Sequence, residues 1–198
     1  MSMPPDHGST ARRAVFLDRD GTINVDRGYV YNREQFEWIP GAIEAIRRLK
    51  EAGALVVVVT NQGGIGHGLY TEADVRILHR FMSAELLSAG TGIDAYYYCP
   101  FHPDAIVETY RTDDDCRKPK PGMIRRAASE LMIDVASSWL VGDKVSDIEA
   151  GRRAGARTVL VRTGYGADAE PFSHADLVAD DLPGAVELIL NDGWTTTP

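Results

Sequence analysis

The stretch Ala14-Val15-Phe16-Leu17-Asp18-Arg19-Asp20-Gly21-Thr22 decides both the fold and the site that we expect of this chain. Its first four residues are apolar and predict a short buried strand. Residues two apart in an extended segment point the same way, so the carboxylates of Asp18 and Asp20 can face one pocket. Gly21 then permits a turn or a close approach of backbone to ligand. Such close carboxylates repel each other, and Mg²⁺, which prefers oxygen ligands, relieves the repulsion. On these residues alone, an ordinary turn after a strand or part of a calcium loop explains the pattern equally well.

Strand and helix patterns alternate along the rest of the chain. The apolar run over 54–59 predicts a strand buried on both faces, which is typical of a parallel sheet. The predicted strands are 14–17, 54–59, 95–98, 139–141, 158–161 and 177–178, and the predicted helices are 41–52, 72–89, 123–131, 145–154 and 183–190. This alternation indicates an α/β fold, a doubly wound parallel sheet with helices on both faces. No insertion is long enough for a sizeable cap domain.

The length of 198 residues suits one domain. We expect it to span 14–191, with a disordered tail over 1–13 and a frayed C-terminus over 192–198. The tail is rich in Pro, Ser and Gly without an apolar core, so it is not a signal peptide. No apolar run approaches the ~20 residues that a membrane span needs.

Composition narrows the partners and the compartment. The net charge of -8 argues against a general affinity for nucleic acid or for an anionic membrane. Two cysteines are too few for a disulfide framework, so a cytoplasmic location is the simpler expectation. Net charge says little about a small anionic substrate, because an acidic protein can still concentrate cations or a metal in one place. We expect a monomer.

Three more segments carry polar side chains at predicted strand ends. Thr60-Asn61-Gln62-Gly63-Gly64 offers a hydroxyl, two amides and backbone N–H groups to phosphoryl oxygens, although an ordinary loop has the same composition. Cys116-Arg117-Lys118-Pro119-Lys120-Pro121-Gly122 places cations on a short loop, which a solvated basic loop also does. Val141-Gly142-Asp143-Lys144-Val145-Ser146-Asp147 is acidic again, with a helix N-cap as the alternative. Ligands of such sheets bind beyond the carboxyl ends of the strands, where all four segments fall.

These four segments, in this order, resemble the haloacid dehalogenase (HAD) superfamily of phosphohydrolases, from Ala14 to about Leu190. The resemblance implies a HAD-like Rossmannoid sheet in which Asp18 is the nucleophile and Asp20 the general acid and base. It implies that Thr60 and Lys118 steady the transferring phosphoryl group, with Lys120 as an alternative to Lys118. It also implies that Mg²⁺ is bound by Asp18, Asp143 and, through its backbone carbonyl, Asp20.

Within the superfamily, segment 18–30, Thr60-Asn61-Gln62 and Cys116-Arg117-Lys118-Pro119 are similar to the D-glycero-D-manno-heptose 1,7-bisphosphate 7-phosphatases. The implied reaction removes the 7-phosphate on the way to nucleotide-activated heptose for lipopolysaccharide or surface glycans. The histidinol-phosphate phosphatases share most of these motifs and are the alternative. In the heptose interpretation Arg117 grips the distal phosphate or the sugar. The residues implied to contact substrate are Asp26, Arg27, Gly28, Tyr29, Thr60, Asn61, Gln62, Gly63, Arg117, Lys118 and Lys144.

Both of these families usually carry a zinc loop of the form Cys-x-His followed by Cys-x-Cys, and this chain departs from it. Cys99 and Cys116 stand at the outer positions, but Phe101 and Asp114 replace the two inner ligands. Structural zinc normally takes four Cys or His ligands. We therefore expect a loop without metal, held by packing of Phe101 and nearby tyrosines. The alternative is a weak zinc site formed by Cys99, His102, Asp114 and Cys116.

Two functions from other classes also deserve comparison. A nucleic-acid 3′-phosphatase is disfavoured by the acidic charge and by the lack of a basic or aromatic stripe. A non-catalytic binding module has no need of both Asp18 and Asp20.

Overall fold

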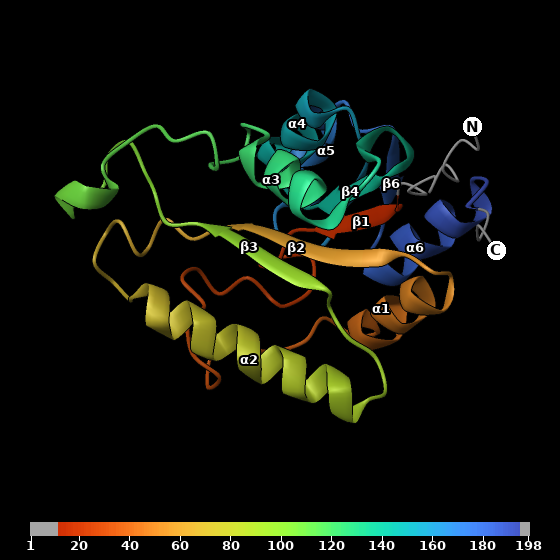
Figure 1. Ribbon diagram of the computed structural model, residues 1–198, viewed down its shortest axis with the longest axis horizontal. Helices are drawn as coiled ribbons and strands as arrows, with labels where there is room; N and C mark the ends of the chain where they lie inside the picture. Colours follow the sequence, from red (N-terminus) through yellow and green to blue (C-terminus); the bar gives the residue numbers. More distant parts are fainter. Residues whose placement is uncertain (1–11, 195–198) are drawn as a thin grey trace, which may run out of the picture.

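The computed structural model describes residues 12–194, which form one six-stranded parallel sheet between two layers of helices (Figure 1). The strands are β1 (Ala14–Leu17), β2 (Leu55–Asn61), β3 (Ala95–Cys99), β4 (Trp139–Gly142), β5 (Arg157–Val161) and β6 (Leu177–Ala179). Their order is β3-β2-β1-β4-β5-β6, and each neighbouring pair is parallel. The predicted doubly wound parallel sheet is therefore confirmed.

The alternating side chains of β1 show how the two layers form. Val15 and Leu17 pack on the face covered by α1 (Ala42–Glu51), α2 (Glu72–Ser88) and α6 (Leu182–Asn191). Ala14 and Phe16 pack on the opposite face with α3 (Gly122–Leu131) and α4 (Val145–Ala154), and α5 (Gly166–Ser173) lies beside α4. Because both faces of β1 are covered, all four of its residues are buried.

Local sequence signals set several of the element boundaries. Thr71 caps α2 in a capping box with Asp74, and Gly155 ends α4 in the left-handed conformation. Helix α5 was not predicted, because it contains Pro171 and has no helical spacing of apolar residues. Two short 3₁₀ turns, Glu108–Tyr110 and Val135–Ser137, complete the described elements.

The domain is slightly longer than predicted at both ends. Arg12, assigned to the tail, forms a parallel bridge to Ile133, and the carbonyl of Arg13 accepts from Leu55. Trp194, assigned to the frayed end, donates from Nε1 to the carbonyl of Ala52. The rest of the predicted tail and C-terminus, 1–11 and 195–198, lies outside the described residues.

The connections at the carboxyl edge of the sheet are loops. Segment 18–41, between β1 and α1, contains only the isolated bridges Asp20↔Asn24 and Asn24↔Trp38. Segment 62–71, between β2 and α2, contains turns alone. Within residues 12–194, neither connection contains a cap domain. No helix of the described chain is both long and apolar enough to cross a membrane.

Candidate active site

The carboxyl ends of three strands bring the predicted acidic and hydroxyl groups together. Asp18 follows β1, Thr60 lies near the end of β2 and Asp143 follows β4, and all three are buried. In the sheet, β2 and β3 lie on one side of β1, and β4, β5 and β6 lie on the other. The order in which successive strands are added therefore changes direction between β1 and β4. Such a switch point is where doubly wound sheets bind their ligands.

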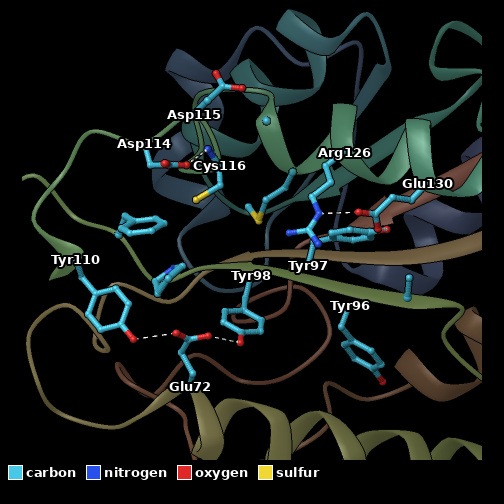
Figure 2. Close-up of a pocket in the computed structure, with 15 residues that line it drawn as sticks. Glu72, Tyr96, Tyr97, Tyr98, Tyr110, Asp114, Asp115, Cys116, Arg126 and Glu130 are labelled. Atoms are coloured by element: carbon cyan, nitrogen blue, oxygen red, sulfur yellow. Dashed lines mark hydrogen bonds and ion pairs between the residues drawn. The ribbon is translucent and has the colours of Figure 1, made fainter.

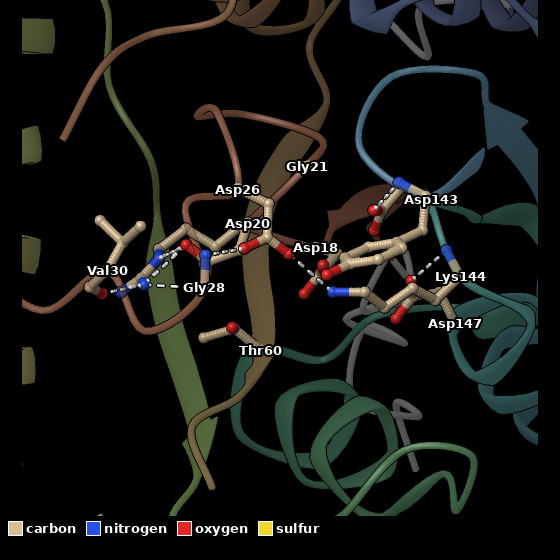
Figure 3. Close-up of polar contacts among 12 residues, drawn as sticks. Asp18, Asp20, Gly21, Asp26, Gly28, Val30, Thr60, Asp143, Lys144 and Asp147 are labelled. Carbon is tan, nitrogen blue, oxygen red and sulfur yellow. Dashed lines mark hydrogen bonds and ion pairs between the residues drawn. The ribbon is translucent and has the colours of Figure 1, made fainter. Parts of the chain in front are cut away.

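Three carboxylates meet at this point. One oxygen from each of Asp18, Asp143 and Asp147 lies within 4.8 Å of the others, and no further group of this kind occurs in residues 12–194. In Figure 3, Asp143 and Asp147 lie on one side of Asp18, and Asp20 lies on the opposite side. The sequence prediction did not include Asp147 among the site residues, and its spacing from Asp143 gives no signal because Asp143 precedes α4 and is not helical.

Lys118 is the cation at the centre of this cluster. Its Nζ donates to Oδ1 of Asp18 at 2.6 Å and to the carbonyl of Val59 at 2.8 Å, and it lies 2.6 Å from Oδ1 of Asp147. Burial acts to lower the pKa of Lys118, but the carboxylates of Asp147 and Asp18 outweigh it and the pKa is raised. Lys118 therefore stays protonated and available to phosphoryl oxygens. Lys120 instead pairs with Asp113 at the surface.

Asp143 carries the unrelieved charge of the site. Its Oδ2 accepts from the N–H of Tyr165 at 2.9 Å, but its buried Oδ1 has no partner among the described residues. Burial, followed by the nearby charges of Asp18 and Asp147, raises the pKa of Asp143 to about 8. A divalent cation would both satisfy the orphaned oxygen and relieve this repulsion.

Glycine is required where the chain passes this carboxylate. A Cβ on Gly21 would lie 2.2 Å from Oδ2 of Asp143, and the φ of Gly21 is +91°. Gly164 approaches the same oxygen equally closely, with φ of +58°. A Cβ on Gly164 would also lie 2.7 Å from Cα of Gly21, so the two glycines let two loops meet beside this carboxylate.

Asp20 is directed differently from Asp18. Its carboxylate accepts from Nε and Nη2 of Arg19, from Nδ2 of Asn24 at 3.0 Å and from Nε2 of Gln62 at 3.1 Å. Its side chain is therefore not part of the three-carboxylate cluster. The expectation that Asp20 reaches a metal through its backbone carbonyl stays a prediction.

Polar side chains connect the second and third predicted segments. The Asn61 side chain accepts from the N–H of Lys118 and donates to its carbonyl, both at 3.0 Å, which fixes the loop that carries this lysine. Nε2 of Gln62 also donates to the Thr60 hydroxyl at 2.9 Å. Tyr70, which was not predicted, donates to Oε1 of Gln62 at 2.7 Å.

A cavity of about 570 Å³ opens above these groups, a size that suits a small ligand. Two of its three Lys and Arg side chains are already paired, Lys118 with Asp18 and Lys144 with Asp26 at 3.0 Å. Arg117 has no ion pair within the described chain; its Nη1 donates to the carbonyl of Phe101. The lining residues are Asp20, Asp26, Gly28, Tyr29, Val30, Asn61, Gln62, Gly63, His67, Tyr70, His102, Arg117, Lys118, Lys144, Ser146 and Tyr165.

Among the predicted substrate contacts, Arg27 and Thr60 do not line the cavity. The Arg27 side chain is 55% exposed, and its guanidinium pairs with Glu37. Thr60 lies beneath the lining rather than in it. His67 and His102, with ring centroids 4.8 Å apart, line the wall without having been assigned to it.

The two cysteines are bonded to each other, so the sulfurs of the considered zinc site are already used. His102 lies against His67 in the cavity wall, and Oδ1 of Asp114 accepts from the N–H of Cys116. The four residues do not form a metal-binding group, and the zinc alternative finds no support. Phe101 contacts Tyr110, as predicted. The disulfide between Cys99 and Cys116 also holds this loop, which was not predicted.

A second cavity, of about 710 Å³, lies along β3, with Cys116 in its wall (Figure 2). The hydroxyls of Tyr98 and Tyr110 both donate to Glu72 there, at 2.6 and 2.8 Å. Arg126 pairs with Glu130 at 2.8 Å. Glu72 and Glu130 are thus held by the two tyrosine hydroxyls and by Arg126, and none of the predicted catalytic residues lines this cavity.

Comparison with known proteins gives consistent results. Residues 115–185 match a family model described as HAD-hydrolase-like. D-glycero-beta-D-manno-heptose-1,7-bisphosphate 7-phosphatases from Salmonella typhi and Yersinia pestis are 48% and 47% identical, over 88% of this chain and 95% of theirs. The crystal structure of a D,D-heptose 1,7-bisphosphate phosphatase from B. bronchiseptica, complexed with magnesium and phosphate, superposes with a TM-score of 0.83 at 34% identity. The match covers 91% of this chain and 99% of that one.

Proposed function

Because the chain belongs to the D-glycero-beta-D-manno-heptose-1,7-bisphosphate 7-phosphatase family of HAD-like hydrolases, we propose that it removes the 7-phosphate of this sugar bisphosphate. The observation that carries the proposal is the buried Asp18, in contact with Lys118 beneath a cavity of small-ligand size. The products are heptose 1-phosphate and inorganic phosphate, on the way to nucleotide-activated heptose. We place this reaction in the cytoplasm and assign it to a monomer.

The metal is proposed to be Mg²⁺, bound by the carboxylates of Asp18 and Asp143 and by the backbone carbonyl of Asp20. Support comes from the orphaned Oδ1 of Asp143 and from the all-oxygen donor set, which suits a hard cation. When bound, the ion neutralises charge on the phosphoryl oxygens and on Asp18. Asp147 is already held by Lys118 and by the N–H of Lys144, so we assign it to positioning the lysine.

Catalysis proceeds in two balanced steps. An oxygen of Asp18 attacks phosphorus, the bond from phosphorus to the sugar oxygen breaks, and Asp20 gives its proton to the departing alkoxide. Asp20, now a carboxylate, takes a proton from water, whose oxygen attacks phosphorus and releases phosphate and free Asp18. Lys118 and Thr60 steady the phosphoryl oxygens in both steps, since phosphoryl transfer depends mainly on positioning and charge stabilisation.

The remainder of the substrate is proposed to lie along the cavity. Arg117 is the cation there without a carboxylate partner in the described chain, which supports a contact with the second phosphate. Asp26, Gly28, Tyr29, Asn61, Gln62, Gly63 and Lys144 complete the proposed contacts. Arg27 is omitted because it pairs with Glu37 outside the cavity.

The test compares kcat/KM for the heptose 1,7-bisphosphate and for histidinol phosphate in one preparation. A strong preference for the bisphosphate is expected, and a preference for histidinol phosphate would refute the substrate. Asp18→Asn is expected to abolish Mg²⁺-dependent phosphate release while the fold is retained. Turnover by purified, folded Asp18→Asn protein would refute the nucleophile.

A further inference from the structure

Arg19, the residue between the two catalytic aspartates, is a fully buried cation with no part in the chemistry described so far. Its side chain has 0% exposure and ranks among the largest fully buried side chains of the protein. Its Nη2 lies 2.8 Å from both oxygens of Asp20, and its Nε lies 3.2 Å from Oδ1. The guanidinium plane is thereby matched to the Asp20 carboxylate, which restricts rotation of that carboxylate.

The same guanidinium reaches the loop that lines the cavity. Nη2 of Arg19 also donates to the carbonyl of Val30, which adjoins the proposed substrate contacts Gly28 and Tyr29. The backbone of Arg19 acts locally as well, since its carbonyl accepts from the N–H groups of residues 22, 23 and 24. Arg19 therefore joins the turn after β1, the Asp20 carboxylate and the cavity loop.

Stability alone does not explain an arginine at this place. Its Nη1 is buried and has no hydrogen-bond partner among the described residues, which costs free energy. A buried ion pair is often no more stable than an apolar replacement of the same volume. A methionine could fill the space without the orphaned donor.

Resting on the phosphatase function proposed above, we propose that Arg19 is a positioning residue for the general acid, holding Asp20 toward the leaving oxygen of substrate seated against the 26–30 loop. Arg19 affects the rate only by positioning Asp20. Replacing Arg19 should therefore slow the reaction only for substrates whose leaving group needs a proton. A sugar alkoxide needs one, whereas p-nitrophenolate leaves readily without one.

The experiment measures kcat/KM for the heptose bisphosphate and for p-nitrophenyl phosphate, because this ratio reports steps up to phosphoryl transfer onto Asp18. Arg19→Met is expected to lower the value for the sugar phosphate about 10²-fold, the lower end of general-acid contributions. The value for p-nitrophenyl phosphate should stay within about threefold of the wild type. Arg19→Lys keeps the charge but loses the fork, and an intermediate sugar-phosphate defect is expected.

The control is Arg33→Met, an exposed arginine of the same loop that contacts the Phe81 ring and not Asp20. Equal losses on both substrates in Arg19→Met would show a merely structural role and overturn the inference. If Arg19→Met does not yield folded protein, Arg19→Lys decides by the same comparison.

Asp20→Asn separates this inference from the proposed function. If Asp20→Asn loses activity on the sugar phosphate selectively and Arg19→Met does not, the Arg19 inference fails and the acid role of Asp20 stands. If Asp20→Asn itself shows no selectivity for the leaving group, the proposed mechanism fails.

Discussion

Nζ of Lys118 lies 2.6 Å from Oδ1 of Asp18, so the proposed nucleophile and its cation form a buried ion pair across 100 residues of sequence. A lysine in this position serves two purposes. It stabilises two of the three crowded carboxylates, Asp18 and Asp147, in the resting protein, and it presents positive charge where phosphoryl oxygens arrive.

Replacing this lysine is expected to affect both purposes at once. Lys118→Ala leaves Asp18 and Asp147 buried without their cation, which should lower the free energy of unfolding by about 3–5 kcal/mol without metal. We expect kcat to fall about 10²–10³-fold. Urea denaturation and steady-state kinetics measure the two effects. Lys120→Ala is the matched control, because Lys120 pairs with Asp113 at the surface, and comparable losses in that variant would contradict the assignment.

The unpaired Oδ1 of Asp143 predicts that the stability of the protein depends on both Mg²⁺ and pH. The pKa of Asp143 is about 8 in the folded protein, above the ordinary value of 3.8. Its contribution to metal-free stability is thus complete below pH 4 and is lost as pH rises toward 8. In Asp143→Asn that loss should disappear from urea titrations in EDTA. Mg²⁺ at about 100 times its Kd should stabilise the wild type by about 2.7 kcal/mol and this variant far less. Equal Mg²⁺ stabilisation of both would contradict a role for Asp143 in binding.

A second titration effect, at His79 of α2, has the opposite sign. His79 stacks on Tyr96, and burial, with a smaller effect of the Arg19 charge, lowers its pKa from 6.5 to about 3. The neutral ring is favoured in the fold, so stability present above pH 6.5 is lost as pH falls toward 3. His79→Phe should remove about 2 kcal/mol of the loss between pH 7 and pH 5. Urea denaturation of the wild type and of His79→Phe at pH 7 and pH 5 measures this difference in stability. An equal loss of stability in both proteins would count against His79 as its cause.

Arg117 should control affinity for the second phosphate. Arg117→Met removes the unpaired cation of the cavity, and the loss of a charge-assisted bond of about 1.5–3 kcal/mol predicts a 10–100-fold higher KM for the bisphosphate. p-Nitrophenyl phosphate, which has one phosphate, should be affected less than about threefold. Arg125→Met, on the exposed side of α3, controls for loss of an arginine. A similar KM change for both substrates would argue against a second-phosphate contact.

Strand ends made much of the site predictable. Asp18, Thr60 and Asp143 each stand at or directly after a run of buried residues, and parallel strands bring their carboxyl ends to one edge. Lys118 follows no strand directly, and its neighbouring arginine and proline supplied the signal.

Contacts between loops that are far apart in the sequence were not predictable. The N–H of Tyr165 reaches Asp143 because the turn between β5 and α5 passes this carboxylate, and α5 has no helical spacing of apolar residues to reveal it. His102 was judged by its distance in sequence from Cys99, yet its neighbour is His67 from another loop. Sequence distance indicates which residues share a local turn, not which loops meet.

The bond between Cys99 and Cys116 has a topological consequence. It closes a covalent ring that begins at the end of β3 and returns immediately before Arg117, with a sequence separation of 17. A single protease cut anywhere between residues 100 and 115 would therefore not divide the protein into separable fragments. The two pieces would migrate together in a non-reducing gel and part only after a thiol is added. The half of the chain that carries Asp18 and the half that carries Lys118 thus have a tether independent of the sheet.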